Sequence, residues 1–220
     1  MIHWKLAWNG WLNVFLKASC PLCNRPATGD LCASCLASLR RCRLANPQQF
    51  WQTDLPLFVW GNYGGMLKRA IAALKYENQP QLAKVLGSEL GKAWQDSLLS
   101  RKQQLRVIPI PLHGTKLKQR GYNQAQLLAE RFCEVTGMPL WASGLKRVRQ
   151  TDAQFGLSAT ERSVNLAGAF EVGKVKGSGG VLLLDDIYTT GATARSAAQV
   201  LQQRGISVVG ILAIATSRQK

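Results

Sequence analysis

The segment from Val181 to Thr193 limits the fold more than any other part of this 220-residue chain. Four apolar residues, 181–184, form a strand of the buried type, the carboxylates of Asp185 and Asp186 follow, and a turn rich in threonine then precedes a helix. Strands and helices that alternate at this spacing predict a parallel sheet, in which ligands bind beyond the carboxyl ends of the strands. The segment therefore predicts an α/β fold with a binding site at this turn.

The turn after the two carboxylates has the features of an anion site. Backbone N–H groups at the start of a helix favour negative charge, Gly191 lets the backbone approach a ligand closely, and threonine hydroxyls add donors. The residues expected to hold a phosphate are Thr189, Thr190, Gly191, Ala192 and Thr193. Asp185 and Asp186 would repel that phosphate, so we expect them to accept hydrogen bonds from sugar hydroxyls or to attract Mg²⁺.

The thirteen residues of this segment resemble the signature of type I phosphoribosyltransferases, which bind 5-phosphoribosyl-1-pyrophosphate (PRPP). The resemblance implies that Asp185 and Asp186 hold the ribose 2′- and 3′-hydroxyls and that the turn holds the 5′-phosphate. A P-loop NTPase would also place Asp after an apolar strand, but it needs a G-x-x-x-x-G-K-[ST] loop. Residues 87–93 come nearest to that loop, and they have one residue too few between the glycines and lack the hydroxyl residue.

A cationic segment, residues 107–124, lies where these enzymes have their pyrophosphate-binding loop, between a strand and a helix. Several cations and the start of the following helix suit a leaving group with several negative charges. The side chains expected to neutralise pyrophosphate are Lys116, Lys118 and Arg120. His113, in the same segment, is expected to be a surface residue.

A polar segment of weak periodicity, residues 146–170, corresponds to the mobile lid of the same enzymes. A lid excludes water and strengthens the charge contacts beneath it. Closure would bring Lys146, Arg147 or Arg149 over the pyrophosphate. The sequence does not identify the acceptor substrate, because it shows neither an obvious general base nor a recognisable hood for a nucleobase.

Five of the six cysteines lie within residues 20–42. Four of them form two C-x-x-C pairs, each of which can point two thiolates at one metal ion. The expected ligands of a structural Zn²⁺ are Cys20, Cys23, Cys32 and Cys35. Such a small region needs a cross-link such as a bound metal ion in order to fold. Four thiolate ligands leave no open coordination position on the zinc for catalysis. A redox dithiol pair or an iron–sulfur cluster are the alternatives, Cys42 is expected to be a bystander, and Cys133 a buried thiol.

Together with this cysteine region, the basic and polar segments resemble the ComF/GntX family. Its members carry R-G-[YF]-N-Q, here residues 120–124, and T-x-x-Q…R-x-x-N-x-x-G-A-F, here residues 151–170. The resemblance covers residues 11–214. It implies a phosphoribosyltransferase fold with an N-terminal zinc-binding region, a link to DNA uptake in naturally competent bacteria, and proteins of the competence machinery as partners.

We expect the chain to divide near residue 48, within a polar loop. Residues 1–48 would contain a tryptophan-rich amphipathic helix and the zinc region, and residues 49–220 the phosphoribosyltransferase-like domain. The helix is expected to pack on the protein, with docking to a membrane surface as the alternative. We expect no transmembrane helix and no signal peptide, and a cytoplasmic location.

The net charge of +16 predicts an anionic partner. Residues 101–150 hold ten Lys and Arg against two Glu, and so carry half of that charge. Three hypotheses result: an enzyme that transfers the phosphoribosyl group of PRPP to a nitrogen nucleophile with Mg²⁺, a factor that binds single-stranded DNA through phosphates and stacking, and a regulator that senses PRPP without chemistry. A basic face that is merely solvated is the alternative to all of them.

Hydrophobic periodicity also predicts the main helices and strands. The expected strands are residues 57–60, 105–110, 181–184 and 207–214. The expected helices are residues 66–76, 82–94, 125–135 and 192–204.

Overall fold

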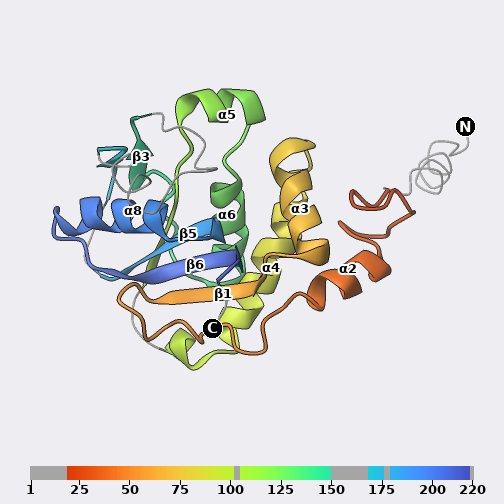
Figure 1. The fold of residues 1–220 in the computed structure, drawn as a ribbon. Helices are drawn as coiled ribbons and strands as arrows, with labels where there is room; N and C mark the ends of the chain where they lie inside the picture. Colours follow the sequence, from red (N-terminus) through yellow and green to blue (C-terminus); the bar gives the residue numbers. More distant parts are fainter. Residues whose placement is uncertain (1–18, 102–104, 150–167, 176–178, 219–220) are drawn as a thin grey trace, which may run out of the picture.

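The computed structural model describes residues 19–101, 105–149, 168–175 and 179–218, and Figure 1 shows their arrangement. Within these ranges the main sheet is parallel, in the order β1-β6-β5-β2. Its strands are β1 (Leu57–Asn62), β2 (Arg106–Pro109), β5 (Val181–Tyr188) and β6 (Val208–Thr216). Two short strands, β3 (Leu145–Arg147) and β4 (Phe170–Val172), pair antiparallel in a second sheet.

Helices cover both faces of the main sheet (Figure 1). They are α2 (Ala33–Arg40), α3 (Gly65–Tyr76), α4 (Leu82–Gln95), α5 (Gly114–Arg120), α6 (Gln124–Thr136) and α8 (Ala192–Gln202), with a 3₁₀ turn at Leu98–Arg101. The expected fold class, a parallel sheet flanked by helices with a small N-terminal cysteine region, is confirmed.

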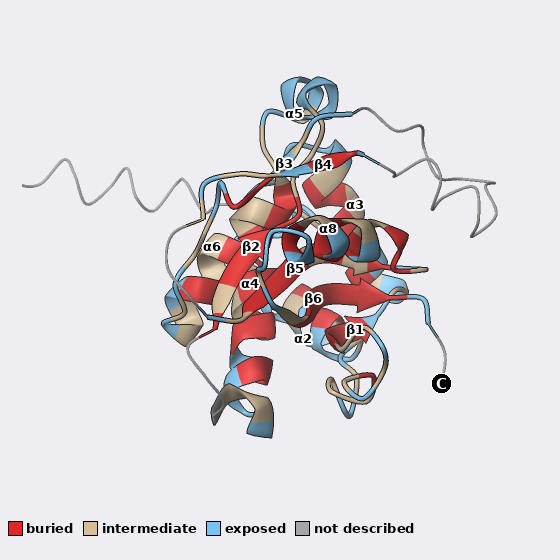
Figure 2. Ribbon diagram, turned by 90° about the vertical axis from the view of Figure 1, so that its left-hand side faces the viewer, coloured by how far each residue is buried: buried red, intermediate tan, exposed pale blue. Residues whose placement is uncertain are grey.

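Successive residues of β5 belong to different cores. Leu182 and Leu184 pack with α3, α4 and α6, whereas Leu183 packs with α8 on the opposite face. Figure 2 shows the strands as mostly buried, in contrast to the exposed helix α5. A strand that is buried on both faces needs apolar residues at every position, which explains the unbroken run at 181–184.

The structure corrects the predicted end of this strand. We expected β5 to stop at Leu184, but it continues to Tyr188 and carries the acidic pair within it. The reason lies in the neighbouring strand, because β6 extends the ladder by pairing Ala213 with Asp185 and Ala215 with Ile187. Polar residues at a strand end thus remain in the sheet when a long partner strand is available.

The cationic segment is a helix where a loop was expected. His113 caps the start of α5, where its side chain accepts a hydrogen bond from the backbone N–H of Thr115, and Gly121 ends the helix with a left-handed φ of 83°. None of its residues is buried, so α5 has no apolar stripe by which periodicity could have revealed it.

Other predictions concern residues outside the described ranges. The tryptophan-rich helix before residue 19 and positions 150–167 of the lid belong to this group. The division at residue 48 falls in the connection between α2 and β1 and stays a prediction. In the parts of the chain that the structure describes, no helix combines the length and the apolar character needed to cross a bilayer.

Candidate functional site

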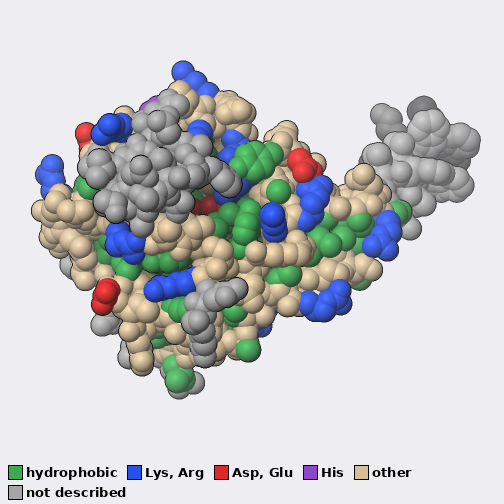
Figure 3. Space-filling model, viewed as in Figure 1, with side chains coloured by type: hydrophobic (Ala, Val, Ile, Leu, Met, Phe, Trp, Pro, Cys, Tyr) green, Lys and Arg blue, Asp and Glu red, His purple; other side chains and the backbone are tan. Residues whose placement is uncertain are grey.

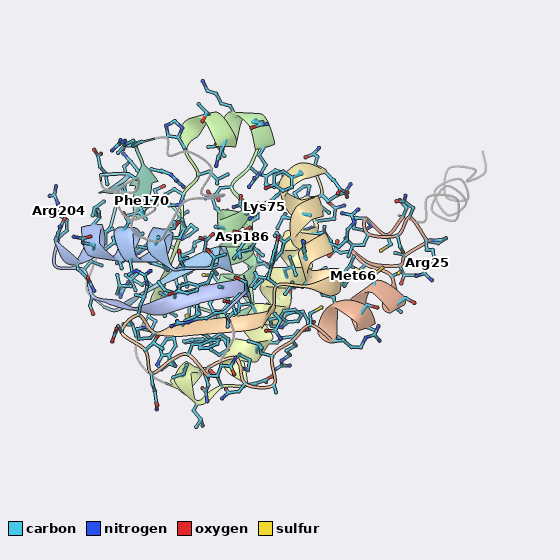
Figure 4. The ribbon with its side chains drawn as sticks, in the orientation of Figure 1. Arg25, Met66, Lys75, Phe170, Asp186 and Arg204 are labelled. Carbon is cyan, nitrogen blue, oxygen red and sulfur yellow. The ribbon has the colours of Figure 1, made fainter. Side chains whose placement is uncertain are left out.

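The acidic pair lies near the carboxyl end of β5 and meets a lysine from another helix. Asp186 is 3% exposed, and its Oδ2 lies 2.6 Å from Nζ of Lys75, near the end of α3. Figure 4 shows these two side chains directed toward one another. Sequence reasoning missed Lys75, because its partner lies more than a hundred residues away along the chain.

The two carboxyl groups differ in their titration. Burial and the charge of Asp186 raise the pKa of Asp185 well above its ordinary value. Burial acts in the same direction on Asp186, but the charge and hydrogen bond of Lys75, together with a hydrogen bond from Asp185 and the charge of Arg120, outweigh burial and lower the pKa of that carboxyl. The pKa of Lys75 is raised by Asp186 in spite of burial. The site therefore holds one buried ion pair beside a second carboxyl whose charged form is disfavoured by burial and by the charge of Asp186.

Cations from three further positions gather around the pair. Partial desolvation and the repulsion of Arg147, Arg120 and Lys75 lower the pKa of Lys116. The charge of Arg120 acts on Asp186, and that of Arg147 interacts with Asp185. Positive groups that repel one another in this way favour the binding of a polyanion between them.

Electrostatic interactions thus connect Lys116 with Arg120 and Arg147, whereas two other cations named from the sequence are placed differently. Lys118 is exposed and lies two residues from Lys116 on α5, so the two side chains do not share a face. Arg149 is exposed on the chain that follows β3.

The threonine-rich turn is fixed by its neighbours. Gly191 has a left-handed φ of 77°, and a Cβ at this position would lie 2.2 Å from Oη of Tyr188, so glycine is required. Arg195 donates to the carbonyl oxygen of Thr190, and Oγ1 of Thr216 donates to the carbonyl oxygen of Tyr188 at 2.8 Å. These contacts hold the turn in place at the start of α8.

The four predicted cysteines form a compact cluster in the described part of the chain. Their sulfur atoms, on Cys20, Cys23, Cys32 and Cys35, all lie within 4.8 Å of one another. Tetrahedral zinc with Zn–S bonds of about 2.3 Å separates its sulfur ligands by roughly 3.8 Å, and the Sγ atoms of Cys23 and Cys32 are 3.6 Å apart. These thiols therefore fit Zn²⁺.

The surroundings of Cys23 favour a thiolate, whereas burial and the neighbouring thiols raise the pKa of Cys35 to about 12. Nε of Arg25 donates to Sγ of Cys23 at 3.4 Å and lowers the pKa of that thiol to about 6. The backbone N–H of Cys35 points at Sγ of Cys32 at 3.5 Å. Donors of this kind stabilise metal-bound sulfur. Cys42 lies outside the cluster, with its Sγ 3.7 Å from the carbonyl oxygens of Ser38 and Gly64.

Comparison with curated proteins finds relatives along most of the chain, whereas no family model matches it. Competence protein F of Haemophilus influenzae is 32% identical over 166 residues, which is 72% of either chain. DNA utilization protein YhgH of Salmonella typhimurium is 29% identical over 199 residues, 87% of this chain and 81% of its own. Competence protein ComFC of Bacillus subtilis is 28% identical over 196 residues, 84% and 72% of the two chains.

Solved structures that match this chain include two phosphoribosyltransferases. Orotate phosphoribosyltransferase from Aeropyrum pernix matches with 19% identity and a TM-score of 0.35, over 68% of this chain and 76% of its own. Adenine phosphoribosyltransferase from Trypanosoma brucei matches with 11% identity and a TM-score of 0.39, over 81% and 77% of the two chains.

Proposed function

The chain belongs to the competence protein F (ComF) family, and from this premise we propose that it binds PRPP with Mg²⁺ and acts in DNA uptake. The observation that carries the proposal is the meeting of an acidic pair, converging cations and a rigid helix-opening turn near the end of β5. PRPP has a complementary group for each of the three: vicinal hydroxyls, a pyrophosphate and a 5′-phosphate.

Each part of the site receives one part of the ligand. Asp185 and Asp186 accept hydrogen bonds from the ribose hydroxyls, and residues 189–193 bind the 5′-phosphate through backbone N–H and hydroxyl groups. The residues proposed to face the pyrophosphate are Lys75, Lys116, Arg120 and Arg147. Lys118 and Arg149 add to the positive field around them. Bound Mg²⁺ would neutralise part of the charge on the pyrophosphate.

We extend the proposal to phosphoribosyl transfer. A ring nitrogen of the acceptor forms a bond to C1 of the ribose as the bond from C1 to the pyrophosphate oxygen breaks. The electron pair of that bond leaves with the pyrophosphate, and the proton of the nitrogen passes to solvent. The cations around the pyrophosphate favour the transition state, because negative charge grows there as the bond breaks.

Calorimetry of the zinc-loaded chain with PRPP and Mg²⁺ tests the proposal. We expect Lys116→Ala to weaken PRPP binding about tenfold or more, because it removes a charge-assisted contact to the pyrophosphate. Binding of ribose 5-phosphate, which lacks that group, should stay unchanged. Lys68→Ala removes an exposed lysine of α3 and should change neither affinity. Failure of the wild-type chain to bind PRPP would refute the proposed function.

Binding of single-stranded DNA is the second candidate function. It is favoured by the exposed helix α5, which adds Lys118 to the basic surface, and by the names of the relatives, which refer to competence and DNA utilization. Fluorescence anisotropy with a labelled oligothymidine at two salt concentrations tests it. We expect binding that weakens steeply as salt rises, since phosphate contacts release counterions. Binding that is absent or insensitive to salt would exclude this candidate, and an effect of PRPP on it would connect the two functions.

A further inference from the structure

A groove of about 820 Å³ lies where the cysteine region meets the body of the protein. One wall is formed by residues 29–31 and the adjoining α2, and the others by α4 and α6. The apolar side chains that line it are Leu31, Leu36, Pro80, Ala83, Val85 and Leu127. None of these residues belongs to the proposed PRPP site, so a ligand of that site does not account for the groove.

The groove is electrically neutral in a strongly basic protein. Its lining has four acidic and four basic residues, whereas the whole chain has a net charge of +16. Two of the basic residues are paired within the walls, Arg40 with Glu89 and Arg131 with Glu134, each at 2.8 Å. Over the face drawn in Figure 3, by contrast, Lys and Arg side chains are more frequent than Asp and Glu. A cationic segment is therefore repelled less in the groove than on a surface with the average charge of this chain.

The segment that precedes the described residues has the properties of an occupant. Residues 1–18 include Lys5 and Lys17 and no acidic residue. Their large apolar side chains recur at helical spacing and are Trp4, Trp8, Trp11, Leu12, Phe15 and Leu16. A helix of this length with Gly10 in its middle has little stability of its own in water, so it needs an apolar surface to pack against.

The segment joins the described chain next to the groove. Ser19 follows it directly, and Sγ of Cys20 lies within 4.8 Å of Sγ of Cys32, the residue after Leu31 of the groove wall. A helix of residues 1–18 is about 27 Å long, so it can extend from this point along the groove. The short connection also gives the segment a high effective concentration at the groove.

We infer that residues 1–18 dock in this groove as an amphipathic helix, with their apolar face against Leu36, Val85 and Leu127. Docking buries aromatic side chains that would otherwise form an exposed apolar patch. It also connects α2 to α4 and α6 through a third helix beside the cysteine cluster. The inference does not depend on the proposed function, since neither the acidic pair nor the threonine-rich turn takes part in it.

Hydrogen exchange of residues 1–18 in the zinc-loaded full chain, followed by mass spectrometry, tests the inference. We expect the backbone amides of the segment to exchange about tenfold or more slowly than those of an unstructured chain of the same sequence, because docking keeps the helical hydrogen bonds closed. Val85→Lys on α4 and Leu127→Lys on α6 each place a charge against the apolar face and should remove this protection. Leu98→Lys changes a residue that is 67% exposed and outside the groove, and this matched control should retain the protection.

Slow exchange of β5 in the same samples identifies the variants that remain folded, and variants on two different walls guard against the loss of one of them. Exchange of the wild-type segment at the rate of an unstructured chain would overturn the inference, and so would protection that persists in a folded groove variant. Protection that requires vesicles of anionic phospholipid would assign the segment to a membrane surface instead. Protection that rises with the concentration of the chain would assign it to a second copy.

Discussion

Replacement of Asp186 by Asn should lower the free energy of unfolding by about 3 kcal/mol, and Lys75→Met in addition should restore most of the loss. The ion pair joins Nζ of Lys75 to Oδ2 of Asp186 at 2.6 Å, with side chains 17% and 5% exposed. Removal of one partner leaves a largely buried charge without compensation, whereas removal of both does not. Urea unfolding of the wild type, the two single variants and the double variant measures the difference.

Ligand binding, unlike stability, should not be restored in the double variant. The double variant Lys75→Met/Asp186→Asn is expected to be folded and yet unable to bind ribose 5-phosphate, because it lacks the carboxylate proposed to accept the ribose hydroxyl. Lys68→Met on the same helix is the matched control and should change neither stability nor binding. If Asp186→Asn and the double variant lose equal stability, the lysine is not balanced by Asp186 in the way we describe.

The dependence on pH follows from the direction of each shift. The folded-state pKa of Asp186 is lowered, so its contribution to stability is present above the pKa of the unfolded chain and is lost as pH falls through the folded value. That of Lys75 is raised, so its contribution is lost as pH rises through the folded value. The free energies of unfolding of the wild type and the double variant should therefore approach each other at low pH and at high pH.

The contribution of Asp185 to stability depends on pH in the opposite direction to that of Asp186. Its raised pKa means that its contribution is present at low pH and is lost as pH rises through the folded value. A carboxyl whose charged form is disfavoured by its surroundings is typical of a functional site rather than of a structural ion pair. The two adjacent carboxyl groups thus have different physical roles, although the sequence presents them as an equivalent pair.

The sequence predicted most of the architecture because the signals were local. The apolar run before Asp185 indicated a strand buried on both faces, and the predicted helices of the body lie within two residues of α3, α4, α6 and α8. The errors concern elements whose signals in the sequence are non-local or absent. The length of β5 depends on its pairing with β6, and α5 has no buried face.

The candidate site was predictable in its chemistry more than in its geometry. The sequence predicted Lys116, Arg120 and Arg147 as cations of one site, and in the structure Arg120 and Arg147 act electrostatically on Lys116. It did not distinguish Lys116 from Lys118, because the helical spacing that separates their side chains was hidden in a predicted loop. Lys75 was passed over as one more polar residue at the end of an amphipathic helix.

The same local reasoning predicted the cysteine cluster, and loss of zinc should unfold it. Cys35 and Leu39 are 2% and 0% exposed and belong to the core beside α2, and Arg40 contacts the buried Glu89 of α4 through a bond of 2.8 Å from its terminal nitrogen to Oε1. In small metal-bound regions the binding of zinc supplies about 10–16 kcal/mol of apparent free energy, which is then the free energy of folding. Chelation or Cys32→Ser should therefore expose the backbone amides of α2 to hydrogen exchange.

Zinc content and hydrogen exchange measured on the same samples give the decisive result. We expect about one zinc per wild-type chain and per Cys42→Ser chain, because Cys42 lies outside the cluster, and a large loss of zinc in Cys32→Ser. Binding of ribose 5-phosphate should persist after chelation, since its proposed contacts belong to β5 and the turn before α8, which are held by β6 and the other strands of the sheet. Undiminished protection of α2 in the zinc-free chain would contradict a structural role for the metal. Loss of ribose 5-phosphate binding together with zinc would contradict the division of the chain near residue 48, and the cysteine region would then be part of the site.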